Sequence, residues 1–139
     1  MIPLLLLLFL SFSIHVDSSD KWHFSGVLDC ALESFRYHMV IYDKDHTSGD
    51  DPISHMSPSP SFKPHYYKAY AESDGDEFDS FGYELYATII HNCNTPERRP
   101  YRKLTVDLGH WSIMDTTYYK VVNITMTNQG EQVPNEIIG

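Results

Sequence analysis

Apolar and polar residues alternate along much of the chain, and the alternation is densest in residues 83–93. The odd positions of this stretch are Leu85, Ala87, Ile89, His91 and Cys93. The even positions also include β-branched and aromatic residues, so both faces of the strand have apolar character. A strand of this kind usually lies inside a sheet, with a second sheet packed on one face. We therefore predict that residues 83–93 form a central strand.

The same period of two predicts strands at residues 22–28, 35–42, 66–71, 102–108 and 118–126. Trp22, Phe24 and Leu28 share the apolar face of the first of these, and residues 66–71 are expected at a sheet edge.

Segments rich in Asp, Gly, Ser and Pro separate these strands, at residues 29–34, 43–52, 52–64, 72–77, 94–100 and 109–116. The segment 52–64 contains four prolines, which remove backbone donors, and we predict an exposed loop there. No amphipathic stretch of helical length stands out. The pattern predicts an all-β fold, a two-sheet β-sandwich of about seven or eight strands.

Residues 3–10 are an almost unbroken leucine run, followed by the small residues Ser11 and Ser13. A membrane-spanning helix needs about 20 apolar residues, so this run fits the apolar part of a secretory signal peptide. We expect residues 1–18 to be the signal peptide, 19–128 one domain and 129–139 a flexible tail. The expected product is secreted, extracellular and without a transmembrane segment.

The chain is acidic, with 19 Asp and Glu against 10 Lys and Arg and a formal net charge of −9. This balance argues against nucleic acid as a partner, because phosphate contacts need clustered Lys and Arg. It also disfavours nonspecific attachment to anionic lipid. Ten tyrosines suit both a sandwich core and an adhesive surface.

Cys30 and Cys93 are the only cysteines. In an oxidising compartment two cysteines most simply form one disulfide bond, and closing so long a loop contributes about 4 kcal/mol in the entropy model. Two unpaired thiols are the alternative. A metal site is disfavoured because there is no Cys-x-x-Cys pair.

The acidic loop after residue 42 raises the possibility of a calcium site, with oxygens from Asp43, Asp45, Asp50 and Asp51. The EF-hand pattern requires glycine at its sixth position and glutamate at its twelfth. Counted from Asp43, the glycine of this loop is at the seventh position and Ser54 is at the twelfth. We prefer a solvated loop, and we predict no metal ion and no cofactor.

Asn123-Ile124-Thr125 is an acceptor sequence for N-glycosylation. Within a strand its two polar members would share the face opposite Ile124 and Met126, which suits an exposed acceptor. We predict that the protein is a glycoprotein modified at Asn123.

An ordered set of short motifs resembles the nematode transthyretin-like family of small secreted proteins. The motifs are Gly26-Val27-Leu28-Asp29-Cys30, Val40-Ile41-Tyr42-Asp43-Lys44-Asp45, Asp74-Gly75 with Phe78, Ile89-Ile90-His91-Asn92-Cys93, Arg102-Lys103 and a last strand around residues 119–126. The resemblance implies a prealbumin-like β-sandwich. Three departures from the family's pattern make this chain a divergent member. The family's cysteine two residues before the Arg-Lys pair is missing, residues 52–64 look like an insertion, and the stretch from Phe78 to Ile89 looks shortened.

The resemblance also implies a noncatalytic extracellular binding protein, a carrier or adaptor for an unidentified small molecule, lipid or protein. His91, Arg102 and Lys103 are the possible polar focus of its binding site. For His91, a hydrogen bond to a backbone carbonyl is the structural alternative. For Lys103, an outward position at a sheet edge is the alternative.

Two other functions stay open. A hydrolase related to hydroxyisourate hydrolase would use His and Arg residues, but the Tyr-Arg-Gly-Ser-like ending is missing from Asn135-Glu136-Ile137-Ile138-Gly139. No Gly-x-Ser-x-Gly or His-Glu-x-x-His motif is present, so we do not expect an enzyme. A hormone carrier like transthyretin would bind in a channel between dimers, which requires a tetramer.

Overall fold

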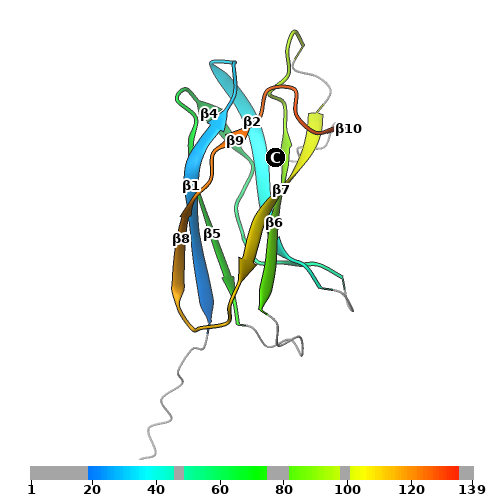
Figure 1. Ribbon diagram of the computed structural model, residues 1–139. Coiled ribbons are helices and arrows are strands. Elements are labelled where there is room, and N and C mark those ends of the chain that lie inside the picture. The colour runs from blue at the N-terminus through cyan, green and yellow to red at the C-terminus, as the bar shows by residue number, and fades with distance from the viewer. Residues whose placement is uncertain (1–18, 46–48, 75–81, 98–100, 135–139) are drawn as a thin grey trace, which may run out of the picture.

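The alternating segments pair into two sheets, with one apolar face of each turned toward the other (Figure 1). The computed structural model describes residues 19–45, 49–74, 82–97 and 101–134, and these contain strands and no helix. In chain order the strands are β1 (Asp20–Asp29), β2 (Ser34–Asp43), β3 (Asp51–Pro52), β4 (Ser59–Phe62), β5 (Tyr66–Ser73), β6 (Tyr83–His91), β7 (Tyr101–Trp111), β8 (Thr117–Val121), β9 (Ile124–Thr125) and β10 (Glu131–Val133). Within this described part, no helix is long and apolar enough to cross a membrane.

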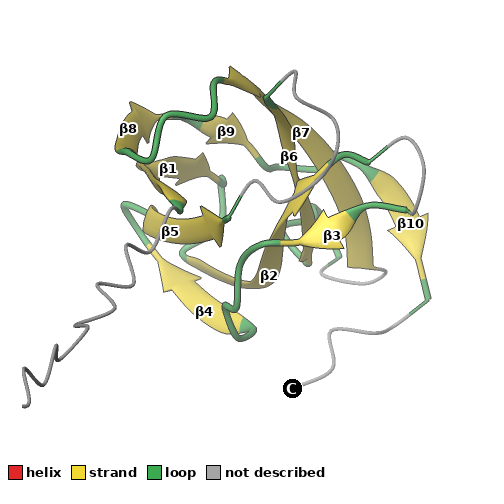
Figure 2. Ribbon diagram, turned by 90° about the horizontal axis from the view of Figure 1, so that it is seen from below, coloured by secondary structure: helices red, strands yellow, loops and turns green. Residues whose placement is uncertain are grey.

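The smaller sheet has the order β5-β1-β8, and β9 continues along β1 beyond β8. In this sheet β5 runs antiparallel to β1, whereas β8 and β9 run parallel to it. The larger sheet has the order β10-β7-β6-β2-β3, with β4 also on β2, and all its pairs are antiparallel. Figure 2 shows β1, β5 and β8 in one layer and β2, β6 and β7 in the other. The predicted all-β, two-sheet β-sandwich is confirmed.

The core lies between the sheets and follows the predicted alternation. Trp22, Phe24 and Leu28 of β1 are buried, as are the odd positions of β6 from Tyr83 to His91. The prediction that β6 is central is confirmed, because β2 pairs with one side of it and β7 with the other. Because the side chains of a strand alternate between faces, the even positions of β6 point outward.

The proline-rich segment is not the exposed loop that we predicted. It includes part of β3 and all of β4, which pair with β2. Between these strands Ile53 is buried and its N–H donates to the Ile41 carbonyl at 2.8 Å, while the Ser54 hydroxyl accepts from the Ile41 N–H at 2.8 Å. Prolines are tolerated because β3 and β4 lie at the edge of the sheet, where an outward backbone position needs no donor.

The last predicted strand, residues 118–126, is interrupted. It forms β8 and β9, and Val122 and Asn123 lie between them outside any strand. Gly26 of β1 faces this break, and a side chain there would collide with the backbone of Val122. Glycine therefore allows the two parallel segments to approach closely.

Two other segments expected as irregular are also paired. Residues 109–111 belong to β7, whose last residue, Trp111, packs edge-on against Phe24. In the predicted tail, β10 pairs with residues 101–103 of β7. Gly130 precedes β10 with φ +96°, and a side chain there would collide with the backbone of Lys103. Residues 135–139 of the predicted tail and the predicted signal peptide, residues 1–18, lie outside the described residues.

Candidate functional site

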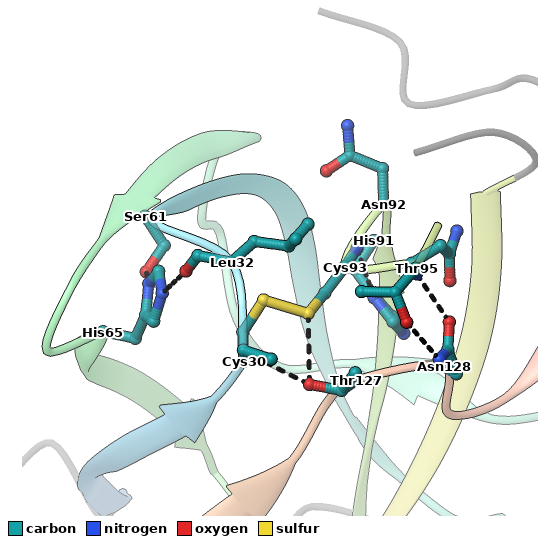
Figure 3. Close-up of a disulfide and its surroundings, with 12 residues drawn as sticks. Cys30, Leu32, Ser61, His65, His91, Asn92, Cys93, Thr95, Thr127 and Asn128 are labelled. Carbon is teal, nitrogen blue, oxygen red and sulfur yellow. Dashed lines mark hydrogen bonds between the residues drawn. A yellow bond between two sulfur atoms is a disulfide. The ribbon is translucent and has the colours of Figure 1, made fainter. Parts of the chain in front are cut away.

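A disulfide bond between Cys30 and Cys93 links the two sheets at one end of the sandwich (Figure 3). Cys30 follows β1 in the smaller sheet and Cys93 follows β6 in the larger one, and both are buried. The segment after β9 runs past both cysteines, because Thr127 Oγ1 accepts from the Ala31 N–H at 2.9 Å and the Cys93 carbonyl accepts from Asn128 N–H at 2.9 Å. The predicted bridge is confirmed. We refer to these residues and their neighbours below as the disulfide end.

His91 is a fully buried part of the disulfide end. Its Nε2 lies 2.8 Å from the Gln129 carbonyl oxygen, and its Nδ1 lies 3.1 Å from the Cys93 backbone nitrogen. A carbonyl can only accept, so Nε2 carries the proton and Nδ1 accepts from the Cys93 N–H. Burial lowers the pKa of His91, the nearby Arg102 lowers it further, and the Gln129 carbonyl opposes the shift. His91 is thus a neutral, structural histidine.

Arg102 lies opposite His91 in the β6–β7 register. Its Nε donates to Asn94 Oδ1 at 2.9 Å and its Nη1 to the Gly130 carbonyl at 2.9 Å, so it holds the turn that leads to β10. Lys103, the next residue, is exposed on the other face of β7. The structure therefore brings His91 and Arg102 together and separates both from Lys103.

A serine–histidine pair also lies at the disulfide end, as Figure 3 shows. The Ser61 hydroxyl is 2.8 Å from His65 Nδ1, and His65 Nε2 is 2.7 Å from the Leu32 carbonyl oxygen. These contacts are similar to those of a nucleophile and its base. However, Ser61 is 6% exposed and His65 is 2% exposed, which leaves no access for a substrate. Through these two hydrogen bonds the pair connects β4 and the residue before β5 with the turn after β1.

The opposite end of the sandwich has a hollow of about 420 Å³ lined by five carboxylates, those of Asp43, Asp45, Asp51, Glu72 and Asp74. Burial raises the pKa of Asp43 to about 6, and the negative charges of Asp45 and Asp51 raise it as well. The hydrogen bond that Asp43 accepts from the Glu84 N–H acts in the opposite direction. The Asp50 carboxylate accepts hydrogen bonds from the Tyr86 hydroxyl and from the Asp45 N–H.

Among the residues that the structure describes, no group of three or more His, Cys, Asp or Glu side chains is placed to hold a metal ion. The four loop aspartates considered for calcium are all described, and they do not form such a site.

The outer face of the smaller sheet carries exposed aromatic residues. His23 of β1 pairs with Tyr70 of β5 on one side and with Tyr119 of β8 on the other. The ring centroids are 5.1 Å apart for His23 and Tyr70, and 5.0 Å apart for His23 and Tyr119, whose rings stack at 10°. His23 and Tyr119 are exposed, and Tyr119 is 76% exposed. These three side chains form a row across the sheet.

A hollow of about 390 Å³ lies beside this row, and we call it the aromatic hollow. Its lining comprises His23, Phe24, Ser25, Lys68, Ala69, Tyr70, Tyr119, Lys120 and Val121. Ser25 lies opposite Lys68 and Val121 in the next cross-strand row, and its short side chain leaves the depression. None of the described residues of the lining is a carboxylate, in contrast to the hollow with five carboxylates at the end of the sandwich opposite the disulfide. Lys68 and Lys120 are the cations of the lining, and Lys120 Nζ also lies 5.6 Å from the centre of the Trp111 ring.

The sequence shows a surplus of tyrosines but does not indicate where this site lies. His23 occupies an outward position of a predicted strand, which was a detectable signal. Its contact with Tyr119 depends on the parallel pairing of β1 with β8, almost 100 residues away in the chain, and alternation contains no information on which strands pair.

Comparison with protein-family models finds no match to this chain, and comparison with curated proteins also finds none. The resemblance to transthyretin-like proteins therefore stays a prediction based on short motifs. The geometry of the aromatic hollow is the stronger basis for a functional proposal.

Proposed function

We propose that the protein is a secreted, noncatalytic binding protein that carries a small aromatic or apolar anion in the aromatic hollow. The observation that supports this most is the exposed row of Tyr70, His23 and Tyr119 beside a hollow with a lysine at its rim. Its volume of about 390 Å³ is within the usual size of small-molecule sites. Large exposed apolar side chains gathered on one face commonly mark a binding surface.

The lining determines the class of ligand. A planar apolar ligand can pack against the aromatic row and Val121, while the Ser25 hydroxyl provides a donor and an acceptor at the floor. The ammonium group of Lys68 favours a carboxylate, sulfonate or phenolate at the rim. Because Lys68 is exposed, its ion pair contributes at most about 1 kcal/mol, and burial of apolar surface dominates the affinity.

Secretion is supported by the leucine run at residues 3–10 and by the disulfide bond, which is typical of proteins in oxidising compartments. The resemblance to transthyretin-like proteins supports the same class. The hydrolase alternative would use His and Arg residues, but His91 is hydrogen-bonded to Gln129 and Arg102 to Asn94 and Gly130. No observation favours that alternative.

Fluorescence titration with 8-anilinonaphthalene-1-sulfonate, an aromatic anion, tests the proposal. We expect saturable binding that the His23→Ala substitution weakens about tenfold, the effect of losing about 1.4 kcal/mol of contacts. His110→Ala is the matched control, because His110 is an exposed strand histidine outside the hollow, and it should leave the affinity unchanged.

Lys68→Gln should weaken this probe but not neutral N-phenyl-1-naphthylamine, which lacks the sulfonate. Equal affinity of the wild type and the His23→Ala variant for both probes would contradict the proposal.

A further inference from the structure

His23 is the titratable side chain at the centre of the aromatic row. Its ring is exposed, lies between those of Tyr70 and Tyr119, and lines the aromatic hollow. Histidine is the side chain that ordinarily gains a positive charge between pH 8 and pH 5. Because the ring of His23 is open to solvent, it can take up that proton without a change of the fold.

The charges around His23 come from all three strands of this part of the smaller sheet. The ionisable side chains nearest to it along β1, β5 and β8 are Lys21, Lys68, Tyr70, Glu72, Tyr119 and Lys120. The Glu72 carboxylate accepts hydrogen bonds from the Tyr70 hydroxyl at 2.8 Å and from the Ser19 hydroxyl at 2.9 Å, and it is not part of the lining. Asp29, which pairs with β9, lies further along β1, about 20 Å from His23 by the rise of a strand. Lysines and not carboxylates therefore share the hollow with His23.

Protonation of His23 adds a charge to a lining that is already positive. Lys68 and Lys120 line the hollow, and none of its described lining residues is a carboxylate. An anion bound there lies within reach of His23, because the histidine and the two lysines line the same hollow. Two unit charges about 4 Å apart in water change an affinity about fivefold. Since the site is exposed, a proton on His23 favours an anion by up to about this factor.

A neutral ligand gains no such attraction. An apolar molecule that packs on the aromatic row covers the His23 ring and removes it from water. This costs more free energy for the protonated ring than for the neutral ring. The affinity for a neutral ligand should therefore stay the same or fall as the pH is lowered.

We propose that protonation of His23 makes the aromatic hollow selective for anions at acidic pH, so that a ligand that stays ionised is held more tightly at pH 5 than at pH 7.5. This inference rests on the proposed function and adds its regulation. Since protonation favours anion binding, anion binding favours protonation by the same factor. A ring nitrogen of His23 therefore takes up a proton from the buffer when the anion binds.

The first experiment compares affinities at the two pH values by fluorescence titration. The wild type should bind 8-anilinonaphthalene-1-sulfonate about fivefold more tightly at pH 5 than at pH 7.5, and neutral N-phenyl-1-naphthylamine no more tightly. His23→Gln replaces the ring with a polar group that does not titrate, so its affinity for the sulfonate should be the same at both pH values. His110→Gln is the matched control and should keep the pH dependence of the wild type. A pH dependence that persists in His23→Gln would overturn the proposal, as would a wild-type affinity for the sulfonate that does not change with pH.

The second experiment measures proton uptake by isothermal titration calorimetry with the same sulfonate at pH 6.5, in two buffers of different ionisation enthalpy. We expect the wild type and His110→Gln to take up a fraction of a proton for each bound probe, and His23→Gln to take up none. Binding that depends on His23 but is not coupled to proton uptake would overturn this inference and leave the proposed function standing. Equal affinity of the wild type and His23→Ala would instead contradict the proposed function, and this inference with it.

Discussion

The disulfide end and the outer face of the smaller sheet both contain histidines beside aromatic rings, but they use them differently. At the disulfide end, both ring nitrogens of His65 and of His91 are hydrogen-bonded and the rings are buried. On the outer face, His23 is exposed and lies between two tyrosines, with its ring stacked on that of Tyr119. Residue type alone therefore does not separate structural from binding residues.

The difference lies in what the polar atoms already contact. A buried group with its hydrogen bonds made inside the protein has no capacity left for a ligand, and disturbing it costs stability. An exposed aromatic row gains contacts only when a partner covers it. Substitutions at the disulfide end should thus change stability without changing ligand binding, and substitutions on the outer face should do the reverse.

Removing the disulfide bond should have the largest effect. The bond joins residues 63 positions apart, and its loss in Cys30→Ala/Cys93→Ala should reduce the free energy of unfolding by about 4 kcal/mol in the entropy model. Urea denaturation measures this effect. The folded fraction of the variant should bind 8-anilinonaphthalene-1-sulfonate with the wild-type affinity. A loss of affinity for the probe without a loss of stability would contradict the structural role of the disulfide end.

His91→Leu should have the next largest effect. The substitution keeps a buried apolar side chain but leaves the Cys93 N–H and the Gln129 carbonyl without their partner, which should cost about 2 kcal/mol. The lowered pKa of His91 means that the unfolded chain binds more protons than the folded protein. In the wild type, this contribution to stability is therefore lost as the pH falls through the ordinary histidine pKa of about 6.5.

Urea denaturation from pH 7.5 to pH 5 should show that the His91→Leu variant lacks this part of the acid sensitivity. The exposed His110 provides the matched control, because His110→Leu should change stability by less than about 0.5 kcal/mol at pH 7.5. Equal pH profiles of the wild type and the His91→Leu variant would show that His91 is not a buried neutral group.

Asp43→Asn should have the smallest effect, and its pH dependence should have the opposite sign. The pKa of Asp43 is raised from 3.8 to about 6, so the folded protein binds more protons than the unfolded chain between these values. Wild-type stability from this group therefore falls as the pH rises from 4 to 6.

The neutral asparagine can still accept from the Glu84 N–H. We expect Asp43→Asn to stabilise the protein by about 1 kcal/mol at pH 7, because partial exposure screens the charge, and to have no effect at pH 4. Urea denaturation at the two pH values measures this difference. A variant that is less stable than the wild type at pH 7 would contradict the assigned pKa shift.

Alternation predicted much of the fold because burial on one face of a strand is a local property. It located the inward residues Trp22, Phe24 and Ile89 and the central position of β6. It missed β10, because the pairing of this strand depends on the turn at Gly130 and its contact with Lys103. It also expected one strand where β8 and β9 are separated, because the close approach of Gly26 to Val122 is not visible in either segment alone.

The site residues were harder to predict for a similar reason. In the sequence His91 and Arg102 stand out only as polar side chains within short motifs, but their hydrogen-bond partners Gln129 and Gly130 come from the segment after β9. Conversely, the aromatic hollow combines β5, β1 and β8, which only the folded topology brings together. Local patterns identified candidate residues, whereas tertiary contacts determined their roles.

The most direct test is a titration of ¹⁵N-labelled protein with 8-anilinonaphthalene-1-sulfonate, followed by amide chemical shifts. We predict that the largest saturable shifts fall on His23, Ser25 and Tyr119, and that the amides of His65 and His91 do not move. Shifts concentrated at the disulfide end, or no saturable shift on the outer face of the smaller sheet, would contradict the assignment of the binding site.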